Sequence, residues 1–137
     1  MAYVGYGINK EVIVDVFNAN VTNAGTTATS AVDTKGRRGP IQVVLDFRAS
    51  GTGSVTPVIQ HSHTTTAGDF VTVDSSEVLN SDGTATAITA VTTSASNQKR
   101  WLKTGKLRRY IRVNFPDATF NQNVAVIFIS EDDDTSQ

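Results

Sequence analysis

The sequence contains no cysteine among its 137 residues, and this absence excludes several kinds of site. A disulfide framework, a zinc–thiolate or iron–sulfur centre and a thiol nucleophile all require cysteine. A run of about eighteen apolar residues, which a membrane-spanning helix needs, is also missing. Charged residues make up only 18% of the chain, below the roughly one quarter of an average domain. The polar share is carried instead by Thr, Ser, Asn and Gly, a composition typical of β proteins with many turns.

Net charge and length further limit the classes of protein to which the chain can belong. Lys and Arg number 12 and Asp and Glu number 13, so the net charge of -1 argues against binding nucleic acid through bulk charge. A chain of 137 residues fits one domain, since single cores organise about 100 to 200 residues. The segment 1–7 has neither a basic region nor an apolar run, so we expect no signal peptide and synthesis in a cytoplasm.

Alternation of apolar and polar residues predicts β-strands, and residues 41–48 give the clearest example. The alternate residues that share its apolar face are Ile41, Val43, Leu45 and Phe47. A glycine-rich turn at 50–53 leads to a second strand over 55–61, and this spacing predicts a hairpin. Pro57 cannot donate a ladder hydrogen bond, so we expect an edge position or a bulge there.

Two segments near the C-terminus also read as strands. Residues 107–115 alternate between an apolar face and a face that carries Arg108, Tyr110 and Arg112. Residues 124–129 are apolar on both faces, which is typical of a central strand covered on both sides. Further strands are expected at 11–17, 29–32, 70–73 and 87–91.

These short strands predict an all-β fold, an antiparallel β-sandwich of jelly-roll-like form, because one sheet needs a second to bury its apolar face. The sandwich is expected over residues 11–130. It is preceded by an extended N-terminal arm over 1–10 and followed by a flexible acidic tail over 131–137.

The residues that could support catalysis are few. His61 and His63 are the two histidines, and on a strand they would share a face, but no third ligand follows at a fixed spacing. No nucleophile elbow or phosphate-binding glycine loop is present, and the acids before the C-terminal tail are scattered singly rather than arranged as a carboxylate pair. We therefore expect no enzyme activity, no catalytic residue, no metal site and no cofactor.

A basic segment without acids is the most distinctive feature of the sequence. It spans residues 99–112 and contains the aromatic residues Trp101 and Tyr110. Basic residues interleaved with aromatics can bind nucleic acid, although the neutral total charge disfavours this interpretation. The segment can equally be an ordinary solvated surface or a face that meets an acidic protein partner. The basic residues are Lys99, Arg100, Lys103, Lys106, Arg108, Arg109 and Arg112.

Two sets of residues are candidates for a protein interface. Trp101, Arg108 and Arg112 combine an aromatic anchor with guanidinium groups, the residue types that concentrate in binding hot spots. Tyr3, Val4 and Tyr6 lie in the N-terminal arm, and an apolar arm without an intrachain partner commonly pairs with a neighbouring subunit. A homo-oligomer, dimer or trimer, is expected on this interpretation.

Several segments form a recognisable combination: 32–36 leading into 41–47, then 51–62 with its Gly-Thr-Gly-Ser-Val-Thr-Pro pattern, then 106–113 and 124–129. Together they resemble capsid decoration or cement proteins of tailed bacteriophages. The resemblance covers roughly residues 30 to 130 and contains no single diagnostic motif. The turn after the second strand is usually acidic in such proteins, whereas residues 63–68 here contain no acid.

The resemblance implies a virion component on the capsid surface that binds the major capsid protein and stabilises contacts between its subunits. It carries over no catalytic residue. A tail or head–tail structural protein is an alternative, and so is a glycan- or receptor-binding β-sandwich module. Glycan sites generally need exposed aromatic platforms, for which the chain offers Trp101, Tyr110 and the tyrosines of the arm.

Overall fold

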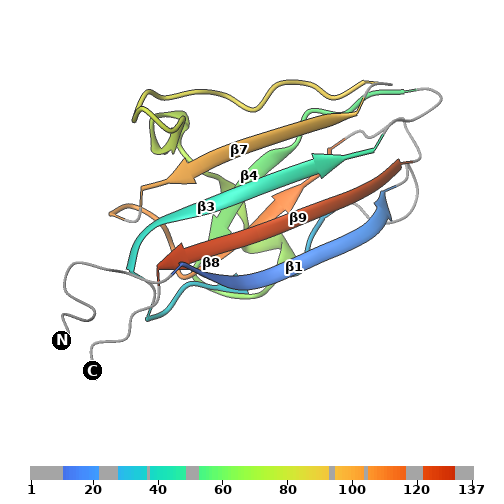
Figure 1. The fold of residues 1–137 in the computed structure, drawn as a ribbon. Coiled ribbons are helices and arrows are strands. Elements are labelled where there is room, and N and C mark those ends of the chain that lie inside the picture. Colours follow the sequence, from blue (N-terminus) through green and yellow to red (C-terminus); the bar gives the residue numbers. More distant parts are fainter. Residues whose placement is uncertain are drawn as a thin grey trace, which may run out of the picture.

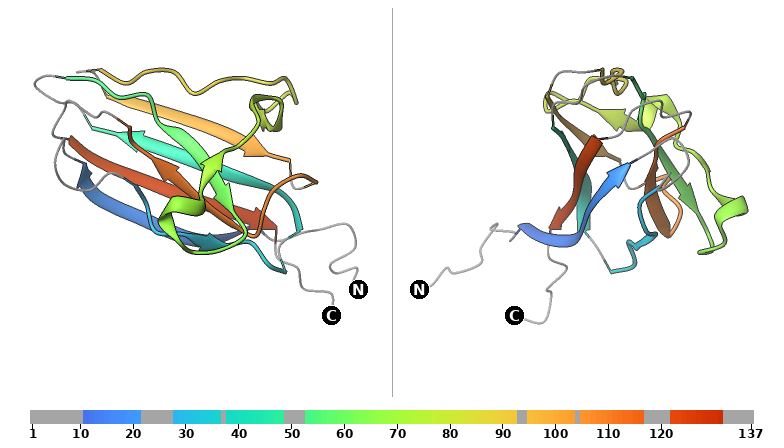
Figure 2. Two further views of the ribbon diagram at one scale, coloured as in Figure 1. Left: turned by 180° about the vertical axis from the view of Figure 1, so that it is seen from behind. Right: turned by 90° about the vertical axis from the view of Figure 1, so that its right-hand side faces the viewer.

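The computed structural model describes residues 11–21, 28–36, 38–48, 53–92, 95–103, 105–116 and 122–131, which form two packed antiparallel sheets. Figures 1 and 2 show the two sheets as layers that face each other. The predicted all-β sandwich is confirmed. The predicted N-terminal arm and all but the first residue of the predicted acidic tail lie outside the described residues.

The five-stranded sheet has the order β1 (Glu11–Val21), β9 (Gln122–Glu131), β3 (Arg38–Phe47), β7 (Ser96–Leu102) and β6 (Val78–Leu79). The four-stranded sheet has the order β2 (Val32–Asp33), β8 (Tyr110–Asn114), β4 (Val58–Ser62) and β5 (Val71–Thr72). Two short 3-10 helices lie on either side of β5 in the chain, η1 (Ala67–Asp69) before it and η2 (Ser75–Glu77) after it. The strand order is compatible with the jelly-roll-like winding that the sequence predicts.

The chain crosses between the sheets where the sequence predicts a hairpin. Strand β3 pairs with β7 and β9, and β4 pairs with β5 and β8, so the two strands lie in different sheets. The hairpin prediction is wrong. A glycine-rich turn between two apolar strands can connect strands of opposite sheets as well as neighbours in one sheet, and the sequence does not distinguish the two. Pro57 stands immediately before β4 rather than in an edge strand, so the ladder begins just after the residue that lacks an N–H.

The core is formed by alternate side chains that both sheets point inward. The inner face of β3 is fully buried, as predicted, and so are Ile111 and Val113 of β8. Phe115 follows β8 and is completely buried; its ring lies 6.2 Å from that of Phe17 and 6.3 Å from that of Phe47, between ring centroids. These aromatic contacts join the two sheets.

Strand β9 is central, as its sequence predicts. It pairs with β1 on one side and with β3 on the other. Its inward residues Val124, Val126 and Phe128 are completely buried, whereas its outward residues Ala125, Ile127 and Ile129 are half-buried. Strand β1 is the edge of the sheet and carries a bulge between Ile13 and Asp15.

Strand β7 was not predicted, because its inward residues are mostly polar. Gln98 and Arg100 point into the molecule together with Leu102, so the inward positions do not show the alternating hydrophobic pattern by which a strand is recognised in a sequence. Backbone pairing on the outer edge of β7 is limited to the two residues of β6. Along the rest of this edge, the side chains of Gln98 and Arg100 bind the backbone of the extended segment 84–92.

Strand β8 is shorter than predicted. It begins at Tyr110, so Leu107 and Arg108 lie in the loop before the strand and not on its alternating faces. The loop is fixed by Arg108, whose backbone N–H donates to Nδ1 of His61 at 3.2 Å.

No helix in the described part of the chain is both long and apolar enough to cross a membrane.

Candidate interaction surface

The outer face of the five-stranded sheet carries a continuous group of apolar side chains. Strand pairing places Ile13 beside Ile129 in one row, and Val16 beside Ile127 and Val44 in the next. Ala125 follows on β9. We call this group the apolar face: Ile13, Val16, Val44, Ala125, Ile127 and Ile129.

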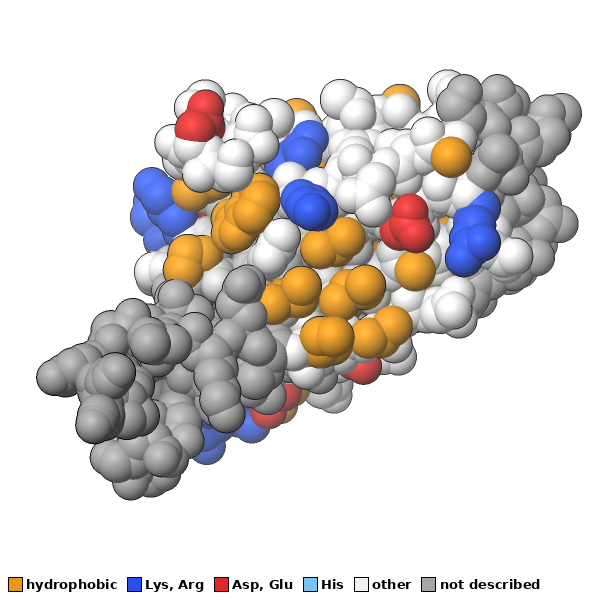
Figure 3. Space-filling model, in the orientation of Figure 1, with side chains coloured by type: hydrophobic (Ala, Val, Ile, Leu, Met, Phe, Trp, Pro, Cys, Tyr) orange, Lys and Arg blue, Asp and Glu red, His pale blue; other side chains and the backbone are white. Residues whose placement is uncertain are grey.

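The apolar face is open to solvent along β1. Ile13 is 63% exposed and Val16 is 52% exposed, which makes them the two most exposed large hydrophobic residues among those the structure describes. Figure 3 shows the hydrophobic side chains gathered over β1, β9 and β3 at the centre of this view. Single exposed apolar residues are ordinary, but a contiguous group with a polar border is typical of a binding surface.

Polar residues border the apolar face along β7 and at one end of β3. Lys99 of β7 pairs with Val44 and is exposed, and Asp46 lies one row further along β3. Asp15 of β1 pairs with the inward-facing Phe128 and so lies on the other side of the sheet, where its Oδ1 accepts a hydrogen bond from the Val16 N–H at 2.8 Å. Trp101 of β7 closes the remaining corner, beside Gln42. An apolar centre with a charged rim is the usual anatomy of a protein interface.

The outer face of the four-stranded sheet has a different character, because its charges are engaged within the chain. The Arg112 guanidinium stacks on Phe70, with Cζ 4.3 Å from the ring centroid, and its Nε donates to Oε1 of Gln60 at 2.9 Å. Partial burial lowers the pKa of Arg112 from its usual value. Arg112 therefore holds η1 and β4 together and is only partly available to a partner.

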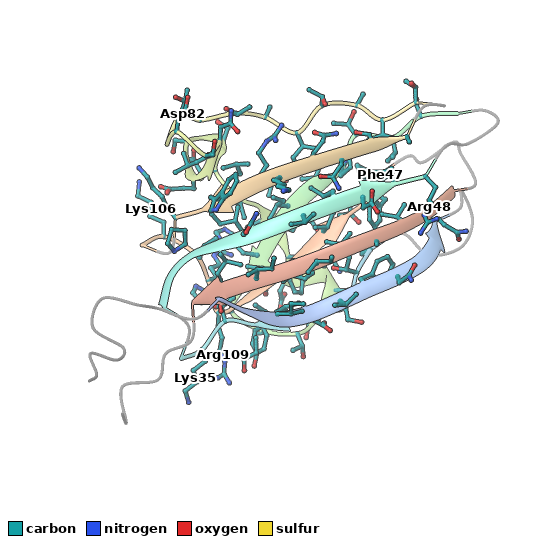
Figure 4. All side chains as sticks on the ribbon, viewed as in Figure 1. Lys35, Phe47, Arg48, Asp82, Lys106 and Arg109 are labelled. Atoms are coloured by element: carbon teal, nitrogen blue, oxygen red, sulfur yellow. The ribbon has the colours of Figure 1, made fainter. Side chains whose placement is uncertain are left out.

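A second arginine of this sheet is paired at its β2 edge. Arg109 donates through Nε and an Nη to the two carboxylate oxygens of Asp33 at 3.0 and 2.9 Å. The hydrogen bonds from Arg109 and from the Lys35 N–H lower the pKa of Asp33 to about 2. Figure 4 shows Arg109 and Lys35 together at this edge, away from Lys106. The pair links β2 to the loop before β8.

The predicted interface residues do not form one surface. Trp101 lies on the outer side of the five-stranded sheet, whereas Arg112 belongs to the opposite sheet and Arg108 to the loop before it. Tyr3, Val4 and Tyr6 lie outside the described residues.

The basic segment is likewise dispersed. Arg100 is buried, Lys106 lies 3.8 Å from a carboxylate oxygen of Glu77, and Arg109 pairs with Asp33, while Lys99 stays exposed. This dispersal weakens the nucleic-acid interpretation, which needs a shared basic surface.

The signal for the apolar face was present in the sequence. Residues 124–129 are apolar on both faces, which implies cover on both sides of the strand. The partners of β9 on that surface, Ile13 and Val16 of β1 and Val44 of β3, follow from strand order and register, which the sequence alone leaves open.

The two histidines are separated by the end of β4. His61 is buried in the strand, and His63 is exposed in the bend that follows, so they do not share a face. Burial lowers the pKa of His61, and the positive charges of Arg108 and His63 lower it further. The described residues contain no group of three or more His, Cys, Asp or Glu that could hold a metal ion.

His61 gives the domain a specific pH dependence. Because its pKa in the folded protein is below the ordinary value of 6.5, the unfolded chain takes up a proton first as the pH falls. The free energy of unfolding should therefore decrease as the pH is lowered below about 6.5. Protonation also removes the acceptor for the Arg108 N–H. Urea unfolding between pH 7.5 and about 5.5 measures the slope.

The matched variants are His61→Asn and His63→Asn. An asparagine at 61 can offer Oδ1 in place of Nδ1 but cannot titrate, so His61→Asn should flatten the slope whatever its effect on absolute stability. His63→Asn should keep most of the slope because His63 is exposed. A native slope in His61→Asn would contradict the assignment.

The fold of this chain is similar to that of several solved structures. No protein-family model and no curated protein matches the chain. The crystal structure of the SPBc2 prophage-derived protein YomS matches with a TM-score of 0.48 and 10% sequence identity, covering 90% of this chain and 97% of that one.

Proposed function

We propose that this chain is a structural component of a tailed-bacteriophage particle, a capsid cement or decoration protein. In this role it binds the outer shell and stabilises contacts between major capsid protein subunits. The observation that carries the proposal is the apolar face, a contiguous apolar surface of the sandwich that is exposed along β1, half-buried over β9 and bordered by Lys99 and Asp46. Such a surface suits permanent assembly better than transient encounter.

The segments that resemble decoration proteins agree with this proposal in their positions. Residues 41–47 and 124–129 form β3 and β9, which present the apolar face, while 106–113 lead into and form most of β8. A cement protein adds interface area that shell disassembly must break, and a β-sandwich provides a stiff body for it. The aromatic residues proposed for a glycan site are divided, since Trp101 and Tyr110 belong to different sheets.

The test is the copy number of this chain in purified virions of the phage that encodes it. Quantitative mass spectrometry should give an abundance comparable to that of the major capsid protein, because a shell-wide cement occupies every repeat of the lattice. A few copies per particle would indicate a tail or head–tail location instead. Absence from the virion would overturn the structural role altogether.

A further inference from the structure

Residues 105–109 lie in the connection from β7 of one sheet to β8 of the other, and we propose that they form a strap which opens in mild acid. The middle of the strap is closed by a buried histidine, whereas its two ends are held by contacts that involve no histidine. Acid therefore frees the middle while the ends stay attached. The strap is a property of the isolated chain and does not depend on the proposed virion role.

The two ends of the strap are held on opposite sheets. Near its start, the Lys106 ammonium lies 3.8 Å from a carboxylate oxygen of Glu77, which immediately precedes β6. At its end, the carbonyl of Arg109 accepts hydrogen bonds from the N–H and the hydroxyl of Thr34 at 2.8 and 2.6 Å. The Arg109 guanidinium also binds both carboxylate oxygens of Asp33 of β2. Lys106 and Arg109 lie apart in Figure 4, so these anchors limit the opening to the residues between them.

The middle of the strap is closed by a hydrogen bond to a buried imidazole. The Arg108 N–H donates to Nδ1 of His61 at 3.2 Å, and His61 is only 9% exposed in β4. The preceding residue, Leu107, is partly buried against the core. Only an unprotonated imidazole nitrogen can accept a hydrogen bond, because both nitrogens are donors in the imidazolium form. Protonation of His61 therefore sets N–H against N–H and removes the contact that holds Leu107 and Arg108 down.

The surroundings of His61 oppose a positive charge while the strap is closed. Its neighbours in the ladder, Val71 of β5 and Ile111 of β8, are uncharged. Among the described residues, the charged groups that act on its imidazole are Arg108 and His63, and both are basic. Burial lowers the pKa of His61 most, and these two groups lower it further. When the strap opens, water reaches the imidazole and the pKa returns toward its ordinary value of 6.5.

This difference in pKa couples the strap to pH. The open strap takes up a proton at a higher pH than the closed strap, so a falling pH favours opening. Because one proton is involved, the ratio of open to closed molecules rises by at most about tenfold for each pH unit. The rise begins near pH 6.5 and ends at the lowered pKa of the closed state. The opening stays local, because the pKa of Asp33 is about 2 and its pairing with Arg109 persists.

Native-state hydrogen exchange of the full chain, followed by NMR in low concentrations of urea, tests the strap. Dividing the intrinsic exchange rate by the measured rate gives a protection factor that is free of the direct effect of pH on exchange. The protection factor of the Arg108 amide should fall by up to about tenfold per pH unit below pH 6.5. It should not depend on low urea, because opening a short strap exposes little surface. The amide of Val43, in the buried centre of β3, should instead exchange through urea-dependent unfolding.

Three variants separate the proton from the anchors. In His61→Asn the side chain still offers an acceptor but cannot titrate, so the protection of the Arg108 amide should lose its pH dependence. His63→Asn is the matched control and should keep most of it, because His63 is exposed. Lys106→Gln loosens one anchor, so it should lower the protection factor of Arg108 by a similar factor at every pH.

A fourth variant keeps the test decisive if His61→Asn fails to fold. Arg108→Gln retains the backbone N–H that His61 accepts but removes the neighbouring cation. The pKa of His61, read from the NMR titration of its imidazole, should then rise toward 6.5, and the fall in protection should be smaller. An unchanged imidazole pKa together with an unchanged fall in protection would contradict the proposed coupling.

Three other results would overturn the strap. One is an Arg108 amide whose exchange has the urea dependence of Val43, since the segment would then open only when the domain unfolds. The second is a protection factor of Arg108 that stays constant between about pH 7.5 and 5.5 in the native chain. The third is a native pH dependence in folded His61→Asn, since another group would then take up the proton.

Discussion

Replacement of Phe115 by alanine should lower the free energy of unfolding by about 3–5 kcal/mol, the largest effect expected for a single substitution in this chain. Phe115 is completely buried and directly follows β8. Its ring stacks on Phe17 of β1 at 6.2 Å and meets the edge of Phe47 of β3 at 6.3 Å. Removing it opens a cavity at the contact between the two sheets.

The position of Phe115 explains why neighbouring side chains cannot fill that cavity. Phe17 and Phe47 belong to strands whose ladders are fixed by β9 and β7, so neither backbone can move inward without breaking its pairing. Phe115→Leu retains most of the buried volume and should cost less than half as much. Phe17→Ala should also cost less than Phe115→Ala, because Phe17 is only half-buried.

Urea unfolding followed by circular dichroism measures these differences at one fixed protein concentration, since self-association would add to the apparent stability. The order expected is Phe115→Ala, then Phe17→Ala, then Phe115→Leu as the mildest. If Phe115→Ala proved no more destabilising than Phe17→Ala, the ring would not connect the sheets as the structure indicates.

The strands predicted correctly are those whose burial follows hydrophobicity. In β3, the residues Ile41, Val43, Leu45 and Phe47 face a core that needs nothing but apolar surface, so alternation alone identifies them. The same holds for Ile111 and Val113 in β8. In these strands the side chains carry the information about which face is inside.

Strand β7 escaped prediction for the opposite reason. Its inward positions include Gln98 and Arg100, which are 8% exposed although both are polar. Their burial depends on hydrogen bonds to a segment about ten residues earlier in the chain. A local pattern contains no such information, so none of the three interpretations of the basic segment places Arg100 inside the molecule.

The candidate surface was only half predictable for a related reason. The sequence indicates that β9 is apolar on both faces, but the outward neighbours Ile13 and Val16 join it only through the register of β1. Conversely, Trp101 and Arg112 are close in the sequence yet lie on different sheets, because the chain crosses the core between β7 and β8. Proximity in sequence is a poor guide to shared surfaces in a sandwich whose strands alternate between layers.

The second large effect is expected at Arg100. Replacement by alanine should lower the free energy of unfolding by about 2–4 kcal/mol, because three partly buried hydrogen bonds to backbone carbonyl groups are lost together. The guanidinium donates to the carbonyl oxygens of Thr86 and Ala87 at 3.0 and 2.7 Å, and to that of Lys99 at 2.7 Å. No carboxylate pairs with Arg100 among the described residues, so these carbonyls are its main stabilising contacts.

These hydrogen bonds take the place of a neighbouring strand. The outer edge of β7 is paired with β6 only at Trp101 and Leu102. Beyond that point the Gln98 amide binds the backbone of Thr89 in both directions, donating to its carbonyl at 3.1 Å and accepting from its N–H at 3.0 Å. Together Gln98 and Arg100 hold segment 84–92 along the edge, which would otherwise expose unpaired backbone groups.

Matched variants separate the hydrogen bonds of Arg100 from its charge. Arg100→Lys keeps the positive charge but cannot reach three carbonyls with the planar geometry of a guanidinium, so it should recover only part of the loss. Lys103→Ala removes an exposed cation just after the same strand and should leave stability near the native value. Full recovery by Arg100→Lys would show that charge alone matters. It would contradict the proposal that the hydrogen bonds of Arg100 hold segment 84–92 in place.

Loss of the Arg100 hydrogen bonds should affect local dynamics and aggregation as well as stability. Without Arg100, segment 84–92 should exchange its amide hydrogens faster, and residues 96–100 of β7 should become an open edge. An open, uncovered edge is a template for pairing with another chain, so Arg100→Ala should aggregate at concentrations where the native protein and Lys103→Ala remain dispersed. Hydrogen exchange and light scattering on the same samples would test this chain of events. Faster exchange without aggregation would mean that the twist of β7 protects its edge unaided, and unchanged exchange would mean that the segment is held by its own turn at Asn80 to Thr84.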